Sequence, residues 1–161
     1  FKHFKNKKLI KAFFNKYQGQ IYTAEYLKES NFLENNCLTF DSNKYNNIKI
    51  KMMYTSMHAW LNEEIIKSII QDLKKEYKDK FFVGLGVLSK GINKNESILA
   101  PEQLERDLKI CKELGVEEVI IFRLGGLNKE YIKVIEKFTY LREISTKEFH
   151  QKWTIPQLKN K

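Results

Sequence analysis

The stretch FFVGLGVL, residues 81–88, decides the fold, together with the second apolar run VIIFRL, residues 119–124. The first run is apolar almost without interruption, which is typical of a strand covered on both faces in a parallel sheet. Between the two runs, a helical pattern begins at Pro101, a favoured first helical residue, and ends at Gly115, where a left-handed cap favours glycine. Strand, helix and strand in this order predict parallel pairing.

The same unit continues on both sides of this stretch. Residues 48–54 (IKIKMMY) alternate like a strand, and residues 61–77 follow with apolar residues at helical spacing and Asn62 as a plausible cap. After residue 124, Asn128 is placed to cap another amphipathic helix that reaches Phe138. Residues 48–138 therefore predict a regular βαβαβα core with parallel strands and right-handed crossovers.

Residues 1–47 are less regular and predict N-terminal helices and a link. Residues 4–17 form an amphipathic helical pattern with a basic face. Such a helix can lie on a membrane, but a barrel helix with a lysine-rich outer face fits this lysine-rich chain better. The remaining expectations are a short helix at 22–29, a short strand at 37–40, a polar link at 41–47 and a helix at 146–153.

Length and composition predict one α/β domain over residues 1–161. The chain has 42% hydrophobic residues, enough for a core, and no apolar run approaches the roughly 18 residues of a membrane span. The chain begins at Phe1, and its best-patterned part resembles the end of a larger repeat. We therefore expect a fragment, the C-terminal half of a partial (β/α)8 barrel.

The net charge of +9 raises the question of nucleic-acid binding. Nearly all the positive residues are lysines, because only Arg106, Arg123 and Arg142 are arginines. Base readout and bidentate phosphate contacts favour arginine. No nucleic-acid partner is therefore expected, and the charge is interpreted as mostly a solvated surface.

The two cysteines lie far apart and in no metal-like spacing. Cys111 falls on the apolar stripe of a predicted helix, where it is expected to be a small buried hydrophobe, and Cys37 lies in the less regular part. Neither a disulfide framework nor a metal site is expected. A cytosolic setting is favoured over a secreted one.

Candidate site residues are sought at the carboxyl ends of the strands, where parallel α/β proteins bind ligands. After the first strand of the core, Tyr54, Ser56, His58 and Trp60 bring a hydroxyl, an imidazole and aromatic rings into one loop. Such a mixture suits a sugar-like ligand, whose ring face stacks and whose hydroxyls form hydrogen bonds. Alternatively, Tyr54 and Trp60 seal the rim of the barrel, and His58 is an ordinary surface residue.

The next strand places Gly84 and Gly86 on one face and its bulky residues on the other. The bulky face is expected to meet the helices, so that the glycine face leaves room for a ligand or for a large neighbouring side chain. Ser89 opens the long loop that follows and is a candidate ligand-binding residue. Alternatively, both glycines merely allow close packing.

The third strand ends at Arg123, followed by Gly125 and Gly126. If Ile120 and Phe122 face the helices, Arg123 faces the barrel interior, where a guanidinium needs a carboxylate, a carbonyl or an anionic ligand. The glycine pair before a helix start could hold a phosphate on backbone N–H groups. Alternatively, Arg123 forms a structural ion pair and the glycines make a tight turn.

The stretch from VGLGVLSKG to APEQLERDLKICKELGVEEVIIFRLGGLNKEYIKVIEKF resembles the last two units of glycoside-hydrolase-like (β/α)8 barrels, and MMYTSMHAW is similar to their sixth-strand segment. The resemblance covers about residues 48–138. It implies a TIM barrel in which Tyr54 lines a sugar subsite. In that family the paired catalytic acids usually lie on earlier strands, and no acidic strand-end pair stands out here.

Three functions follow as hypotheses. The first is the C-terminal portion of a carbohydrate-active barrel whose catalytic acids lie outside this chain, which would make the protein glycoside-hydrolase-like. The second is a barrel that binds a phosphorylated small metabolite, suggested by the glycines and Arg123. The third is a non-catalytic, lysine-rich interaction module. The sequence identifies no catalytic residue and suggests no cofactor.

Overall fold

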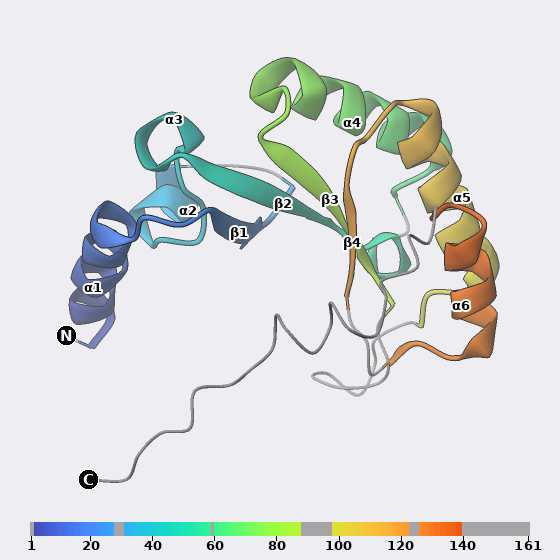
Figure 1. The fold of residues 1–161 in the computed structure, drawn as a ribbon, viewed down its shortest axis with the longest axis horizontal. Helices are drawn as coiled ribbons and strands as arrows, with labels where there is room; N and C mark the ends of the chain where they lie inside the picture. Colours follow the sequence, from blue (N-terminus) through green and yellow to red (C-terminus); the bar gives the residue numbers. More distant parts are fainter. Residues whose placement is uncertain (1, 28–30, 59, 88–97, 123–125, 140–161) are drawn as a thin grey trace, which may run out of the picture.

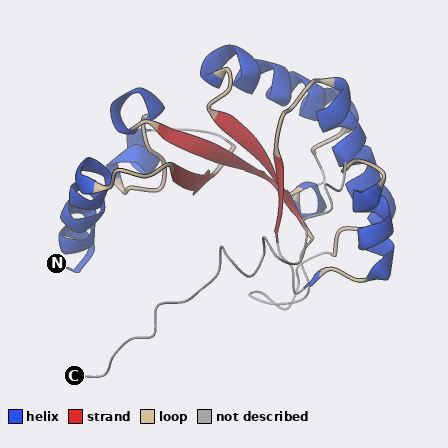
Figure 2. Ribbon diagram, viewed as in Figure 1, coloured by secondary structure: helices blue, strands red, loops and turns tan. Residues whose placement is uncertain are grey.

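The computed structural model of the chain describes residues 2–27, 31–58, 60–87, 98–122 and 126–139. Within these residues, the centre is one parallel sheet of four strands in the order β1-β2-β3-β4 (Figures 1 and 2). The strands are β1 (Ile21–Glu25), β2 (Asn47–Met53), β3 (Phe81–Gly86) and β4 (Val119–Phe122). The predicted parallel α/β arrangement of the last three strands is therefore confirmed.

The first strand was missed by the sequence analysis. The short helix predicted at 22–29 is wrong, because Ile21–Glu25 pairs in parallel with β2. Its inward residues, Thr23 and Glu25, are polar, so the segment lacks the apolar alternation that identifies a strand. The short strand predicted at 37–40 is also wrong. Cys37 has a φ of 56°, in a turn that follows helix α2 (Asn31–Asn35).

The helices after β2 begin and end close to their predicted positions. Helix α4 (Glu63–Tyr77) is capped by Asn62, whose side chain accepts a hydrogen bond from the backbone N–H of Ile65. Helix α5 (Pro101–Glu113) starts at its proline and is followed by Gly115 at φ 63°, as predicted. Helix α6 (Lys129–Glu136) is capped by Asn128.

The two faces of the sheet have different surroundings. The bulky residues of β3 pack against α4, α5 and α6 in the main core, as expected, and Cys111 is buried in the same core. Figure 1 shows these three helices along one side of the sheet. On the opposite face, a Cβ added to Gly84 would meet Ile50 and Phe122. The glycines of β3 therefore face away from the helices. The core residues of β3 are Phe81, Val83 and Leu85, and Val87, just after the strand, joins the same core.

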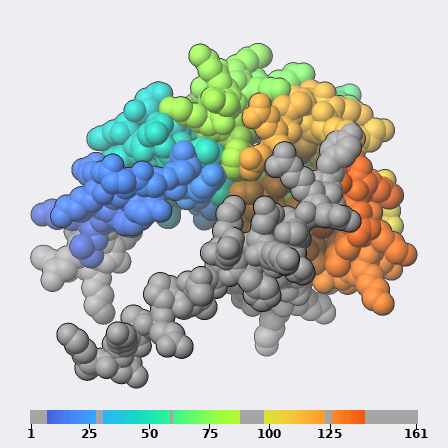
Figure 3. Space-filling model, viewed as in Figure 1, coloured from blue at the N-terminus to red at the C-terminus, as the bar shows by residue number. Residues whose placement is uncertain are grey.

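The N-terminal elements lie beside the β1–β2 end of the sheet. Helix α1 (Lys2–Lys16) confirms the predicted helix, and Phe14 on it stacks on Phe40 with ring centroids 4.5 Å apart. A short helix, α3 (Ser42–Tyr45), occupies the segment predicted as a polar link. In Figure 3 the N-terminal residues and the residues of α6 lie at opposite ends of the molecule.

Two expectations concern the rest of the chain. The helix predicted at 146–153 lies outside the described residues. Within the part of the chain that the structure describes, no helix is long and apolar enough to cross a membrane.

Candidate functional site

Tyr54 follows the carboxyl end of β2 and its ring covers Gly86 of β3. A Cβ added to Gly86 would lie 2.7 Å from Cδ1 of Tyr54, closer than real Cβ contacts come. The ring also meets Phe122 edge-on, with centroids 6.3 Å apart. Burial raises the pKa of the Tyr54 phenol. Gly86 thus makes room for a large neighbouring side chain, which is one of the two roles considered for it.

The segment after Tyr54 forms a short 3-10 helix, η1 (Thr55–Met57), that carries half-buried Ser56. Beyond it, the rings of His58 and Trp60 lie 5.7 Å apart at an angle of 45°, and half of the Trp60 surface (51%) is exposed. An exposed tryptophan beside an imidazole offers an amphipathic surface with both a flat face and polar atoms.

A buried acid holds this loop in place. The hydroxyl of Thr55 donates to Oδ2 of Asp107 on α5 at 2.5 Å, and the Arg106 guanidinium donates to Oδ1 at 2.7 and 2.9 Å. Asp107 is only 1% exposed. Burial raises the pKa of its carboxyl, opposed by the hydrogen bonds from Thr55 and Arg106. With both oxygens occupied under the loop, Asp107 acts as an anchor for η1.

The expected orientation of β4 is wrong. Phe122 lies on the glycine face, beside Tyr54 and Gly84, whereas Val119 and Ile121 pack against the helix-covered core. Arg123 was expected in the barrel interior on the condition that Phe122 faces the helices. Because side chains alternate along a strand and Phe122 faces the other way, that condition does not hold.

The remaining candidates at this end fall in two groups. Ser89, Arg123 and Gly125 lie outside the described residues. Gly126 is described and half-buried before α6. The backbone N–H groups of Glu130 and Tyr131, in the first turn of that helix, donate to the side-chain oxygen of Asn128. These N–H groups are therefore already engaged, although a phosphate at the start of the helix would need them.

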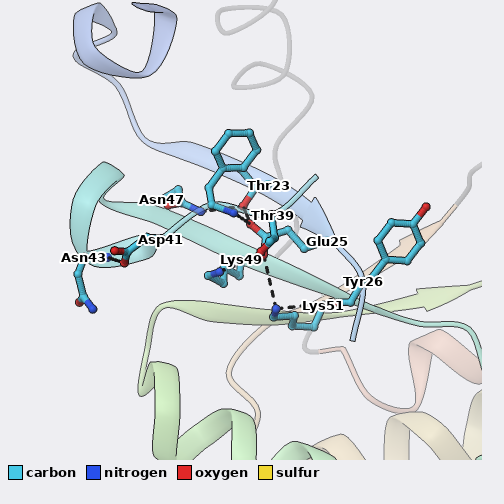
Figure 4. Close-up of polar contacts among 10 residues, drawn as sticks. Thr23, Glu25, Tyr26, Thr39, Asp41, Asn43, Asn47, Lys49 and Lys51 are labelled. Carbon is cyan, nitrogen blue, oxygen red and sulfur yellow. Dashed lines mark hydrogen bonds and ion pairs between the residues drawn. The ribbon is translucent and has the colours of Figure 1, made fainter. Parts of the chain in front are cut away.

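A second polar cluster, which the sequence analysis missed, is buried on the helix side of β1 and β2 (Figure 4). Its centre is the carboxylate of Glu25, which is 1% exposed. Oε1 accepts from the Thr23 hydroxyl at 2.7 Å and from the Phe40 N–H at 3.1 Å. Oε2 accepts from the Thr39 hydroxyl at 2.6 Å. Both carboxylate oxygens therefore have hydrogen-bond donors, as a buried polar group requires.

Two lysines of β2 complete the cluster. Lys49 and Lys51 place their ammonium groups 3.0 and 3.5 Å from Oε2 of Glu25, and both are 1% exposed or less. The same ammonium groups lie 5.1 and 5.2 Å from the centroid of the Tyr77 ring, at the end of α4. These distances allow cation–π attraction in a setting shielded from water. The expectation that the lysines are a solvated surface is wrong for these two.

The sequence contained a signal for this cluster. The stretch IKIK at residues 48–51 alternates apolar and charged residues, which was interpreted only as a strand. In a parallel sheet both faces are covered, so charged residues on either face must be buried and paired. That reasoning would have flagged Lys49 and Lys51, although not their partner Glu25.

The described residues include no group of three or more His, Cys, Asp or Glu side chains placed to hold a metal ion. No family model, curated protein or solved structure matches the chain.

Proposed function

We propose that the chain is the C-terminal half of a (β/α)8 barrel and binds a carbohydrate-like ligand at the carboxyl ends of its strands. The observation that carries this proposal is the aromatic surface at the end of β2. There Tyr54 is held over Gly86 and against Phe122, and Trp60 stands half-exposed beside His58.

The winding of the sheet supports the barrel. A doubly wound sheet reverses its strand order and carries helices on both faces, whereas a barrel adds strands in sequence and keeps its helices outside. Here the order is β1-β2-β3-β4, and α4, α5 and α6 share one face with the core residues of β3. The backbone N–H of Phe40, in the connection between β1 and β2, donates a hydrogen bond to the Glu25 carboxylate, which lies on that same face.

The composition of the loop supports the ligand class. A sugar presents an apolar ring face and a rim of hydroxyls, which suit an aromatic side chain and nearby polar atoms. Trp60 offers the flat face, while His58 and the Tyr54 hydroxyl offer polar atoms. The Thr55–Asp107 hydrogen bond fixes the start of the loop, which reduces the ordering cost of binding.

The proposal assigns binding to this chain, and hydrolysis to acids outside it. Glycoside hydrolysis needs two carboxyl groups flanking the scissile bond. Asp107 is not placed for that role, because it is buried under η1 with its oxygens engaged by Thr55 and Arg106.

Tryptophan fluorescence tests the proposal. The sequence has two tryptophans, so a Trp153→Phe variant leaves Trp60 as the sole reporter. We expect cellohexaose or maltohexaose to change Trp60 emission in a saturable way. Tyr54→Ala should weaken that binding about tenfold, because an aromatic contact contributes roughly 0.5–1.5 kcal/mol beyond area burial.

An exposed aromatic far from the loop provides the control. Phe32 on α2 is 72% exposed, so Phe32→Ala should leave the titration unchanged. Emission that does not respond to either oligosaccharide, or a response equal in the Tyr54→Ala and Phe32→Ala variants, would refute the proposal.

A further inference from the structure

Helix α1 presents an exposed apolar stripe. Phe14 marks the side of the helix that faces the rest of the molecule, because its ring stacks on Phe40 with centroids 4.5 Å apart. The stripe consists of Leu9, Phe13 and Tyr17, which follow one another at intervals of four residues and are 68%, 53% and 50% exposed. With about 3.6 residues per turn, Phe13 and Leu9 lie about 100° and 140° round the helix from Phe14. Both therefore lie off the side that packs on Phe40.

A solvated outer face does not account for this stripe. A helix that only covers a barrel buries its large apolar side chains and exposes its polar ones. In α1 three large apolar side chains are exposed together, and the rings of Phe13 and Tyr17 stack on each other with centroids 5.1 Å apart. Apolar side chains gathered on a surface mark a contact with another molecule.

The charge of α1 indicates what kind of molecule this is. The helix has six lysines and no acidic residue among its 15 residues. Lys8, Lys11 and Lys16 are exposed, and none of them forms an ion pair with an acid of the described residues. These ammonium groups are available to an anionic partner, unlike those of Lys49 and Lys51, which lie beside Glu25.

We propose that α1 docks the chain on an anionic lipid bilayer, with the stripe at the level of the acyl chains and the lysines among the headgroups. Such a bilayer offers negative charge beside an apolar layer, which is the combination that α1 presents. Lys16 lies within about 20° of Leu9 round the helix, and its long stem lets the ammonium reach the headgroups. A protein covering the same stripe would desolvate such border lysines.

This surface is independent of the carbohydrate proposal. Helix α1 stands at the β1 end of the sheet, apart from α4, α5 and α6 (Figure 1). The aromatic surface around Tyr54 and Trp60 follows β2 and includes no residue of α1. Either proposal can therefore fail without the other.

Co-sedimentation of the full 161-residue chain with vesicles tests the inference. We expect binding to vesicles of equal parts phosphatidylcholine and phosphatidylserine, little binding to phosphatidylcholine alone, and weaker binding as salt rises, because exposed charges are screened. Phe13→Gln keeps a good helix former and should weaken binding about tenfold, because one large apolar side chain no longer leaves water. The control Ile132→Gln removes an exposed apolar side chain of α6 and should leave binding unchanged.

Charge variants separate the role of α1 from that of the net charge. Replacing Lys8, Lys11 and Lys16 together by Gln should weaken binding roughly a hundredfold, at about fivefold for each lysine near an anionic surface. A control triple replaces one exposed lysine on each of α4, α5 and α6, so it lowers the net charge by the same amount and should weaken binding much less. Its substitutions are Lys75→Gln, Lys109→Gln and Lys133→Gln.

Several results would overturn the inference. Equal binding to the neutral and the mixed vesicles would show that the lysines do not select an anionic surface. Equal losses in the two lysine triples would assign the attraction to net charge instead of α1, and a Phe13→Gln chain that binds like the native one would exclude the stripe from the bilayer. A chain that ignores vesicles but binds single-stranded DNA, or forms a dimer that Phe13→Gln dissociates, would assign the stripe to another partner.

Discussion

One face of the sheet is covered in two contrasting ways. Along β3, the inward side chains are apolar and pack against α4, α5 and α6. Along β1 and β2, the inward side chains include five buried polar ones, which are Thr23, Glu25, Asn47, Lys49 and Lys51. The apolar half is held by burial, which depends little on direction. The polar half is held by hydrogen bonds and ion pairs, each of which requires its partner in place.

The two halves should therefore differ in how well they tolerate substitutions. An apolar core loses stability in proportion to the volume removed, and neighbouring side chains can partly relax around the loss. A buried ionic cluster is stable only as a set, because deleting one member leaves the others desolvated without compensation. Glu25 is the sharpest example, since five donors from five residues converge on its two oxygens.

The largest effect is expected from Glu25→Gln. The substitution keeps the shape of the side chain but leaves the ammonium groups of Lys49 and Lys51 beside a neutral amide. Breaking a buried ion pair from one side costs about 3–5 kcal/mol, a large share of the stability of a typical domain. Urea unfolding followed by circular dichroism would measure the loss in the free energy of unfolding.

Two companion variants sharpen that result. Adding Lys49→Met and Lys51→Met to Glu25→Leu removes the whole set of charges and should recover most of the lost stability, since apolar replacement of a buried ionic set is often neutral or stabilising. Leu85→Ala, at a fully buried position of β3, should cost about 2–5 kcal/mol as an apolar reference. If Glu25→Gln lowers the free energy of unfolding by less than about 1 kcal/mol, the scale of an exposed ion pair, the buried cluster does not stabilise the polar half as described.

A smaller effect is expected where the apolar half meets the aromatic surface. Gly86→Ala would place a Cβ 2.7 Å from the Tyr54 ring, so the ring must move, at a cost of about 1–3 kcal/mol. At Gly84 the nearest atom, a methyl carbon of Ile50, is 3.1 Å away, so Gly84→Ala should cost less. Thermal unfolding of both variants measures the difference.

A double-mutant cycle checks the cause. If the Tyr54 ring is the obstacle, Gly86→Ala should cost less in a Tyr54→Ala background than in the native chain, because the two residues are in contact. Equal costs in both backgrounds would mean that the glycine is required for another reason.

The contrast between the two halves also explains what the sequence could predict. The positions of β3, α4, α5 and α6 follow from local features, such as the apolar run at 81–88, the proline at 101 and the left-handed Gly115. Each of these signals acts within a few residues of the element it defines. The apolar half therefore appears in the sequence as a pattern.

The polar half does not appear in this way. Strand β1 was interpreted as a helix because Thr23 and Glu25 are polar, and their burial is made possible by partners far along the chain, such as Asn47 and Lys49. No local pattern reports a partner 24 residues away. The predicted orientation of Phe122 was wrong for a related reason. The four residues of β4, VIIF, are all large and apolar, so the sequence does not indicate which face of the strand is covered.

The smallest effect concerns the two cysteines, one in each half. Burial, with the nearby Asp107 carboxylate, raises the pKa of the Cys111 thiol to about 12, and the residue is 1% exposed. The thiolate is the reactive form, and at a fixed pH below 9 a rise in pKa from 9.0 to about 12 lowers its fraction about a thousandfold.

We expect the native chain to release one equivalent of thionitrobenzoate from Ellman's reagent, through half-buried Cys37, and two equivalents in concentrated guanidinium chloride. Cys37→Ser should abolish the native reaction without changing the fold. Rapid reaction of that variant in its native state would show that the apolar half opens readily, and that the two coverings of the sheet differ less in rigidity than their contacts indicate.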